Sequence, residues 1–213
     1  MADCFDATNA TFSLFGAGIT KPEGQRPYMN GTIKDVLEWM NRPKMMHLTE
    51  QLRSIVDEKE QKDFKATKLP FVTFSGQFKY RNEEGLVQHS GLQCFDFDHL
   101  DSYQEICRIK ALLMSDPFFS TELMFTSPRG NGLKWVTHID LGRGSHQQWY
   151  LAIRNYLRAT YGLEADGAPA NVASACFLCY DSELIINPEF NLFKYEIISS
   201  FWDTISFSFN GLT

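Results

Sequence analysis

The sequence lacks any uninterrupted apolar stretch long enough to cross a membrane, and its first residues lack a basic segment followed by an apolar run. We therefore expect no signal peptide, no membrane partner and a cytoplasmic location. The sequence has only five cysteines, an odd number without the regular spacing of a disulfide framework. This is typical of proteins in a reducing compartment. The net charge of −6 excludes a uniformly basic coat for non-specific DNA binding, although it permits a local basic groove.

Two local clusters remain ambiguous. Cys176 and Cys179 form a CxxC, but no second pair completes a zinc site, and their odd spacing in an apparent strand directs the thiols to opposite faces. The densest positive neighbourhood is either a solvated face or part of a nucleotide-facing groove. Its members are Lys62, Lys65, Lys68, Lys79 and Arg81.

The first third of the chain is expected to be a mainly helical lead-in. A helix capped by Thr32 stops before Pro43, and a second helix runs from about residue 49 to 65. Strands follow at about 70–74 and near 78–80. The length and the 18 phenylalanines suffice for one sizeable core.

From Gly91 onward the order of elements is that of the split β-α-β unit of ferredoxin-like and RRM-like domains. Capping boxes open its two helices at Ser102 and Ser145. We therefore predict an α+β fold with a palm at about 91–181, whose first and third strands lie together at the centre. Its strands are expected at about 92–98, 122–126, 133–139 and 175–180. The chain then divides into a lead-in (1–90) packed on the palm, the palm domain (91–190) and a C-terminal edge strand or tail (191–213).

Two carboxylates interrupt the apolar run that ends at Phe97. Alternate residues of an extended chain point to the same side, so Asp96 and Asp98 leave one face of the sheet together. Like charges this close repel unless a cation lies between them, and carboxylate oxygens suit Mg²⁺ or Mn²⁺, the ions of phosphoryl and nucleotidyl transfer. The alternative is a strand end whose aspartates cap the next helix. His99 is interpreted as a local hydrogen-bonding residue.

A loop with two glycines joins the second and third strands of the palm. Gly130 and Gly132 allow backbone N–H groups to converge on an anion, while Ser127, Arg129 and Lys134 add donors for a triphosphate. Taken alone, the segment also fits an ordinary turn. Its spacing after the carboxylate pair, one helix and one strand, favours the nucleotide site.

With Asp166 in an acidic loop further on, these segments resemble the archaeo-eukaryotic primase superfamily, the primase-polymerase group. More narrowly, the chain is similar to the N-terminal domain that precedes virulence-associated protein E-type helicases in bacterial mobile elements. Asp96 and Asp98 match the first motif of the superfamily, Ser127 matches the serine of the second, and Asp166 matches the aspartate of the third. The resembling segments are Lys68–Pro70, Ser75–Gly76, Ser90–Gly91, Phe95–Leu100, Ser127–Lys134 and Phe177–Asp181.

The resemblance implies a DNA primase-polymerase, a metal-dependent nucleotidyltransferase acting in replication of a mobile element. Asp96, Asp98 and Asp166 would hold two Mg²⁺ or Mn²⁺ ions, which lower the proton affinity of the attacking 3′-hydroxyl and neutralise the leaving pyrophosphate. The loop residues and Lys134 would position the triphosphate. The implied partners are a nucleoside triphosphate, a single-stranded DNA template and a helicase domain or protein.

Two positions depart from the superfamily pattern. Lys134 stands where a histidine is expected, and Ser174 stands where an arginine should touch the incoming nucleotide. Lysine contacts phosphate only as a point charge, and serine removes a bidentate donor. These departures favour the alternative of a catalytically weak or inactive primase-like domain that binds single-stranded DNA or nucleotide beside a helicase. Asp181 is an alternative third carboxylate.

Two other classes with acidic motifs fit less well. A haloacid-dehalogenase-type phosphohydrolase requires a parallel sheet and a later Gly-Asp turn, and the sequence has no Gly-Asp dipeptide. An EF-hand loop fails because Leu100 occupies its third ligand position.

Overall fold

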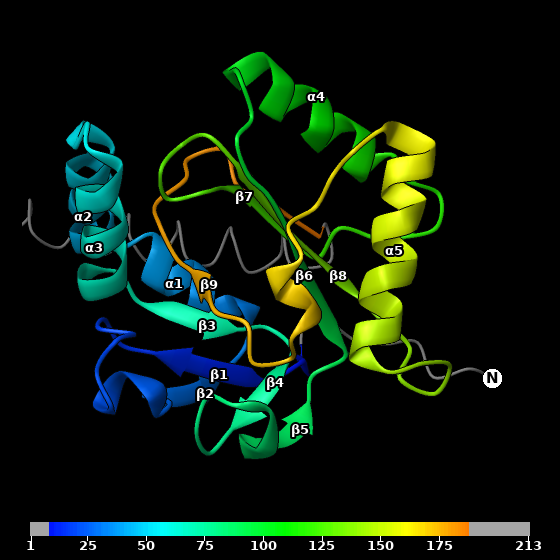
Figure 1. The fold of residues 1–213 in the computed structure, drawn as a ribbon, viewed down its shortest axis with the longest axis horizontal. Coiled ribbons are helices and arrows are strands. Elements are labelled where there is room, and N and C mark those ends of the chain that lie inside the picture. Colours follow the sequence, from blue (N-terminus) through cyan, green and yellow to red (C-terminus); the bar gives the residue numbers. More distant parts are fainter. Residues whose placement is uncertain (1–8, 188–213) are drawn as a thin grey trace, which may run out of the picture.

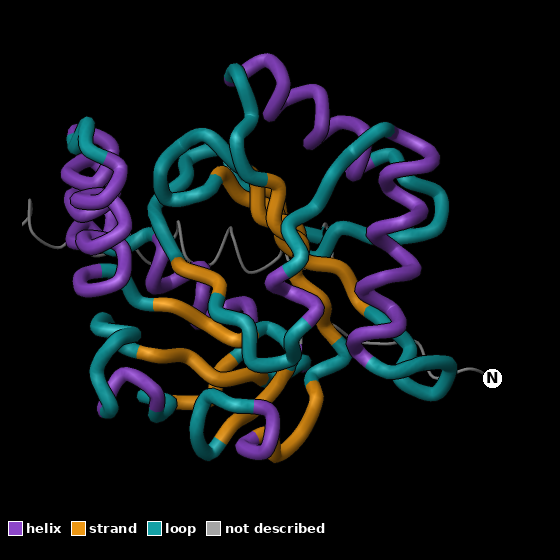
Figure 2. Tube along the Cα trace, viewed as in Figure 1, coloured by secondary structure: helices purple, strands orange, loops and turns teal. Residues whose placement is uncertain are grey.

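The computed structural model describes residues 9–187, which form two four-stranded sheets and a two-stranded hairpin, all antiparallel (Figures 1 and 2). The first sheet has the order β2-β1-β3-β9 and contains β1 (Phe12–Phe15), β2 (Met29–Gly31), β3 (Phe71–Thr73) and β9 (Cys176–Phe177). The second has the order β10-β7-β8-β6 and contains β6 (Leu92–Phe97), β7 (Leu123–Thr126), β8 (Leu133–His138) and β10 (Ile185–Ile186). The hairpin joins β4 (Gly76–Phe78) and β5 (Leu86–His89).

Five α-helices surround these sheets in the described part of the chain. They are α1 (Ile33–Met40), α2 (Pro43–Ser54), α3 (Glu58–Lys68), α4 (Tyr103–Met114) and α5 (His146–Tyr161). In Figure 1, α4 and α5 lie on one side of the second sheet, and α2 and α3 lie at the opposite side of the molecule. None of the helices within residues 9–187 is both long and apolar enough to cross a bilayer.

Helix starts follow the capping rules that the sequence predicts. Thr32 and Asp35 form a reciprocal box at α1, as do Ser145 and Gln148 at α5, and the Ser102 hydroxyl accepts the Glu105 N–H at 3.2 Å. Each box satisfies N–H groups that have no partner inside the helix. The predicted helix starts at 32, 102 and 145 are therefore confirmed.

The second sheet is buried on both faces, and the alternation of its strands decides which way each side chain points. Phe95 and Trp135 pack toward α4 and α5, in one apolar cluster with Tyr150. Leu92 and Val136 pack on the other face, toward the first sheet and α1. Asp96 lies two residues from Cys94 on β6, so it shares the face that is turned to the first sheet.

The α+β class is confirmed, and β8 lies between β6 and β7 as the split unit requires. The prediction of a fourth palm strand at about 175–180 was wrong. Cys176 and Phe177 pair with β3 of the first sheet, where Phe177 contacts the Phe71 ring at 5.7 Å between centroids. The edge of the second sheet beside β7 is taken by β10, so β7 and β8 are its central strands and β6 lies at the other edge. The prediction that the first strand of the palm lies at the centre was therefore wrong, although it does pair with the third strand.

The lead-in differs from its prediction in two ways. It contains the strands β1 and β2, which the sequence analysis did not predict because their apolar segments are short. The single helix expected at about 49–65 is instead two helices, α2 and α3, because the chain turns at Ile55 and Asp57 then caps α3. The predicted edge strand or tail at 191–213 lies outside the described residues.

Candidate metal centre

Three acidic side chains from distant segments converge at the end of β6. Asp96 is the penultimate residue of that strand, Asp98 follows it directly, and Asp166 lies in the loop after α5. One carboxylate oxygen of each lies within 4.8 Å of the other two. Asp96 is half-buried, whereas Asp98 and Asp166 are exposed. The structure thus brings together the three carboxylates that the sequence analysis grouped.

Backbone contacts hold Asp166 against β6. Its N–H donates to the Asp96 carbonyl at 2.8 Å, and the Tyr150 hydroxyl donates to the Asp166 carbonyl. The Tyr150 ring stacks on Phe95, with 4.9 Å between centroids. Burial raises the pKa of Tyr150 to about 12, so its hydroxyl keeps the proton that it donates. The backbone of Asp166 is therefore held by β6 and by Tyr150, and its carboxylate stays exposed.

The donor set of this centre fits a divalent cation. The Asp96 Oδ1 atom is buried and has no hydrogen-bond partner among the described residues, although a buried carboxylate oxygen normally needs one. The three residues offer only hard carboxylate oxygens, the ligand type that Mg²⁺ and Mn²⁺ prefer. Asp96, Asp98 and Asp166 are the residues that would hold such an ion.

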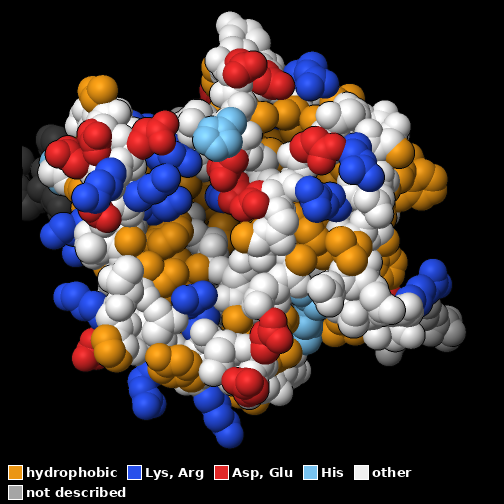
Figure 3. Space-filling model, viewed as in Figure 1, with side chains coloured by type: hydrophobic (Ala, Val, Ile, Leu, Met, Phe, Trp, Pro, Cys, Tyr) orange, Lys and Arg blue, Asp and Glu red, His pale blue; other side chains and the backbone are white. Residues whose placement is uncertain are grey.

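Positive side chains lie near two of the three carboxylates, Asp96 and Asp98. Lys134 lies opposite Asp96 in the β6–β8 register, and the two form an ion pair. Burial lowers the pKa of Lys65 on α3, the charges of Lys134 and Arg129 lower it further, and Asp98 opposes them. Figure 3 shows acidic side chains at the middle of this face and basic side chains beside α2 and α3, with a hollow between. We call Lys65, Arg129 and Lys134 the cationic cluster.

The loop between β7 and β8 uses two of its N–H groups for hydrogen bonds within the loop. The Gly130 N–H donates to the Ser127 carbonyl at 2.9 Å, and the Ser127 N–H donates to the Gly132 carbonyl at 2.8 Å. These N–H groups are therefore used within the loop, and Ser127 itself is buried. Of the predicted phosphate donors, only Arg129 and Lys134 belong to the cationic cluster.

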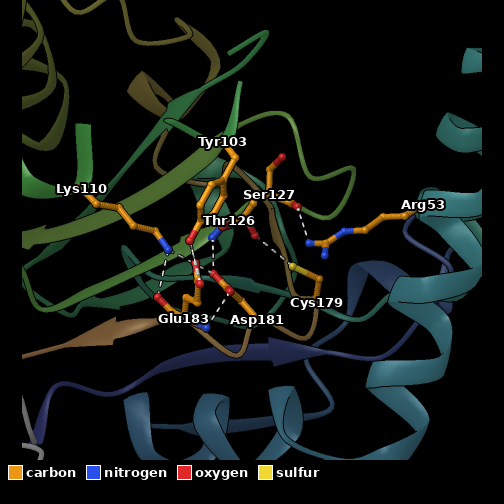
Figure 4. Close-up of polar contacts among 8 residues, drawn as sticks. All are labelled: Arg53, Tyr103, Lys110, Thr126, Ser127, Cys179, Asp181 and Glu183. Carbon is orange, nitrogen blue, oxygen red and sulfur yellow. Dashed lines mark hydrogen bonds and ion pairs between the residues drawn. The ribbon is translucent and has the colours of Figure 1, made fainter. Parts of the chain in front are cut away.

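Arg53 of α2 fastens this loop, as Figure 4 shows. Its guanidinium donates to the carbonyls of Pro128 at 3.2 Å and Ser127 at 3.4 Å. Gly130 has a φ of +86°, which favours glycine, and a Cβ there would lie 3.3 Å from the Arg53 Nε atom. The loop is thus held from the first half of the chain, a contact that no local pattern predicts.

Asp181, the alternative third carboxylate, is a structural residue. Its carboxylate accepts the backbone N–H groups of Thr126 at 2.7 Å and Glu183 at 2.9 Å, and lies 3.7 Å from the Lys110 ammonium (Figure 4). It is buried and is not one of the three converging carboxylates. The prediction of Asp166 as the third member is therefore the one that the geometry favours.

A small pocket of about 30 Å³ adjoins Asp96 and Lys134. Ser174 lines it, and the serine hydroxyl donates to the Ala168 carbonyl at 3.0 Å. The position at which the resemblance predicts an arginine thus lies near the candidate metal centre. Here its short side chain bonds its own loop and adds no positive charge.

The cysteines of the CxxC do not act together. Cys176 lines the small pocket with Cys94, and its pKa is lowered by a hydrogen bond from Cys94 and by the charges of Lys134 and Lys65, against the effect of burial. The Cys179 thiol instead donates to the Thr126 carbonyl at 3.2 Å. Because β9 ends at Phe177, the two thiols do not lie on opposite faces of one strand as predicted, although their partners differ.

A chain of neutral histidines supports the loop after Asp166. The Gly91 N–H donates to His89 Nδ1 at 3.0 Å, so His89 Nε2 donates to His146 Nδ1 at 3.0 Å and His146 Nε2 donates to the Pro169 carbonyl at 3.1 Å. Burial, together with a smaller effect of the charge of a protonated His146, lowers the pKa of His89 to about 4.

This chain predicts acid sensitivity. Between pH 6.5 and 4 the unfolded state binds a proton at His89 that the folded state does not, so stability falls as the pH falls. After discounting for the partial exposure of His89, we expect a loss of about 1–2 kcal/mol. Urea unfolding at several pH values measures it, and His89→Gln should flatten the curve in this window. An equal slope in both proteins would contradict the assignment.

Two residues of the site were not predicted from the sequence. Lys65 was noted only within a positive neighbourhood, since the spacing of lysines along a helix cannot tell which faces a carboxylate pair. Tyr150 fits the apolar face of α5, and nothing in its local sequence indicates that its hydroxyl reaches Asp166.

Neither a curated protein nor a solved structure matches the chain. The family model described as "BT4734-like, N-terminal domain" matches residues 64–185. That span is more than half of the chain and includes the three carboxylates and the cationic cluster. The chain therefore belongs to the BT4734-like N-terminal domain family.

Proposed function

We propose that this chain is a metal-dependent nucleotidyltransferase of the primase-polymerase kind, which extends a strand on a single-stranded DNA template during replication of a mobile element. The observation that carries the proposal is the convergence of Asp96, Asp98 and Asp166 within 4.8 Å, facing the cationic cluster. Nucleotidyl transfer needs both parts, since cations must be held at the reacting phosphate and the rest of the triphosphate must be neutralised.

The proposed roles fall to two groups of residues: the three carboxylates bind metal ions, and the cationic cluster binds the triphosphate. Bound Mg²⁺ or Mn²⁺ would supply charge neutralisation and lower the proton affinity of the attacking hydroxyl. Asp96, Asp98 and Asp166 hold the ions, while Lys65 and Arg129 bind phosphate oxygens and orient the triphosphate. The Lys134 ammonium neutralises Asp96. Because the lysine side chain is flexible, the ammonium can move from Asp96 to a phosphate oxygen of the bound nucleotide. Positioning and charge therefore account for the reaction, and no side chain needs to act as a nucleophile.

A second candidate has specific support. The ion pair with Lys134 already neutralises Asp96, and Ser174 provides no guanidinium beside the small pocket. Both features suit a catalytically weak or inactive domain that binds nucleotide or single-stranded DNA next to a helicase. In that case the cationic cluster would act as an anion-binding surface and the carboxylates would bind at most one ion.

One assay separates these candidates. The purified chain is incubated with a labelled primer on a longer template, nucleoside triphosphates of either sugar type, and Mn²⁺, Mg²⁺ or EDTA. We expect products extended by one or more nucleotides with a divalent ion and none with EDTA. Binding of nucleotide or single-stranded DNA without any product would favour the second candidate. If the chain bound none of Mn²⁺, nucleotide and single-stranded DNA, both proposals would fail.

The role of Lys65 gives a further prediction. Lys65→Gln should raise the KM for the incoming nucleotide about tenfold and change kcat less than about threefold, because it removes a phosphate contact made in both ground and transition states. Steady-state extension kinetics measure both constants. Lys62→Gln, one turn earlier on α3 and exposed, is the matched control. Equal KM values for the two variants would remove Lys65 from the site.

A further inference from the structure

A second concavity, which we call the aromatic pocket, lies away from the metal centre between the first sheet and the α1–α2 corner. It has a volume of about 250 Å³ and shares no lining residue with the small pocket beside Asp96. Gly16, Tyr28, Trp39, Arg42, Lys44 and Lys68 are among its lining residues. Such an opening is large enough for one planar ring and its substituents.

The aromatic side chains of this pocket are exposed or only partly buried. The Tyr28 side chain is 75% exposed although it lies at a pocket wall, and its ring centroid is 5.9 Å from that of Trp39, at an angle of 59°. The Arg42 guanidinium lies 5.7 Å from the Trp39 ring centroid. Rings that are exposed, paired and backed by a guanidinium form a stacking platform for a nucleobase.

The charged residues that line the aromatic pocket within the described part of the chain all have one sign. Arg42, Lys44 and Lys68 are exposed, and none of the pocket-lining residues within 9–187 is acidic, in a chain whose net charge is −6. The surface therefore selects an anion. Inorganic phosphate would leave the rings uncovered, and an acidic peptide would offer no stacking, whereas a nucleotide presents both groups.

We propose that the aromatic pocket binds one nucleotide of a single-stranded nucleic acid, with the base against Tyr28 and Trp39 and the phosphates against Arg42, Lys44 and Lys68. Lys68 lies one turn after Lys65 on α3, so this helix connects the pocket to the cationic cluster. The site goes beyond the proposed function, because it binds strand without metal ions or catalysis.

Fluorescence anisotropy with a labelled 12-nucleotide oligothymidylate tests this site. The full chain is used in EDTA, so failure of the metal-dependent reaction cannot affect the result. We expect Tyr28→Ala to weaken binding about tenfold, as for loss of one stacked base. Replacing Arg42, Lys44 and Lys68 together by alanine should weaken binding at least about tenfold. The slope of the logarithm of the binding constant against the logarithm of salt concentration should become shallower by an amount that corresponds to the loss of roughly two phosphate contacts.

The matched control removes three exposed arginines elsewhere, Arg108, Arg143 and Arg158, with the same change in net charge. We expect its affinity to stay within about threefold of the native chain. Equal weakening by the two triple variants would reduce the effect to overall charge and overturn the proposal. Thermal unfolding of each variant establishes that it is folded.

An abasic oligomer of the same length separates base from phosphate. It should bind the native chain about tenfold more weakly than oligothymidylate, and Tyr28→Ala should remove that difference. If the abasic strand, or a polyglutamate peptide, bound the native chain as tightly as oligothymidylate, the pocket would be a general anion site and the nucleobase assignment would be wrong.

Discussion

Asparagine in place of Asp166 is expected to reduce metal-dependent strand extension at least about a thousandfold, equivalent to about 4 kcal/mol of transition-state stabilisation. Asparagine has nearly the same shape as aspartate, but it lacks the negative charge that holds a divalent ion. The substitution leaves the backbone N–H and carbonyl contacts of residue 166 unchanged. The amide oxygen of asparagine can also accept the Ala168 N–H, which Asp166 Oδ1 accepts at 3.4 Å. The fold should therefore remain, so the loss can be assigned to the carboxylate.

Two measurements make this prediction specific. The Mn²⁺ affinity of Asp166→Asn should fall about tenfold to a hundredfold, in parallel with the extension rate, while the unfolding midpoint stays close to native. Asp101→Asn is the control, because it removes an equal charge from an exposed residue that is not one of the three converging carboxylates. A rate for Asp166→Asn within threefold of this control would show that Asp166 holds no catalytic ion.

The second half of the fold was more predictable than the first because its signals are local. The N-cap serines Ser102 and Ser145 indicate where α4 and α5 begin, and the alternation of apolar residues indicates β6 and β8, all within the sequence segments that form them. The placement of Asp96 and Lys134 on one face of adjacent strands follows from the same alternation. The part of the candidate metal centre that Asp96 and Lys134 form could thus be predicted from the sequence.

The remaining features depend on contacts between distant segments. All four residues of β1 are buried, but such a short apolar run does not reveal a strand until β3 pairs with it. The strand at 176–177 was assigned to the wrong sheet because its apolar side chains suit either partner equally well. Arg53 and Lys65 contact the site from helices in the first half of the chain, and such contacts leave no local pattern.

Alanine in place of Gly132 is expected to damage both stability and activity. The added Cβ would lie 2.6 Å from the Phe97 carbonyl oxygen, closer than such contacts allow, as well as 3.0 Å from the Ser127 Oγ atom and 3.2 Å from Asp98 Oδ1. The loop must then move away from the end of β6, where Asp98 begins. We expect unfolding to become easier by about 1–3 kcal/mol, as for other overpacked sites.

The same displacement should slow strand extension about a hundredfold, because a shift of about 1 Å in a positioning group can cost this much. Urea unfolding and the Mn²⁺-dependent rate measure the two effects. Gly167→Ala is the matched control, since Gly167 directly follows Asp166 and its Cβ would meet no atom within 4 Å. That variant should keep native stability within about 0.5 kcal/mol. If both alanine variants behaved alike, close contact between the loop and β6 would not be what positions Asp98, and the glycine at 132 would have no role in the metal centre.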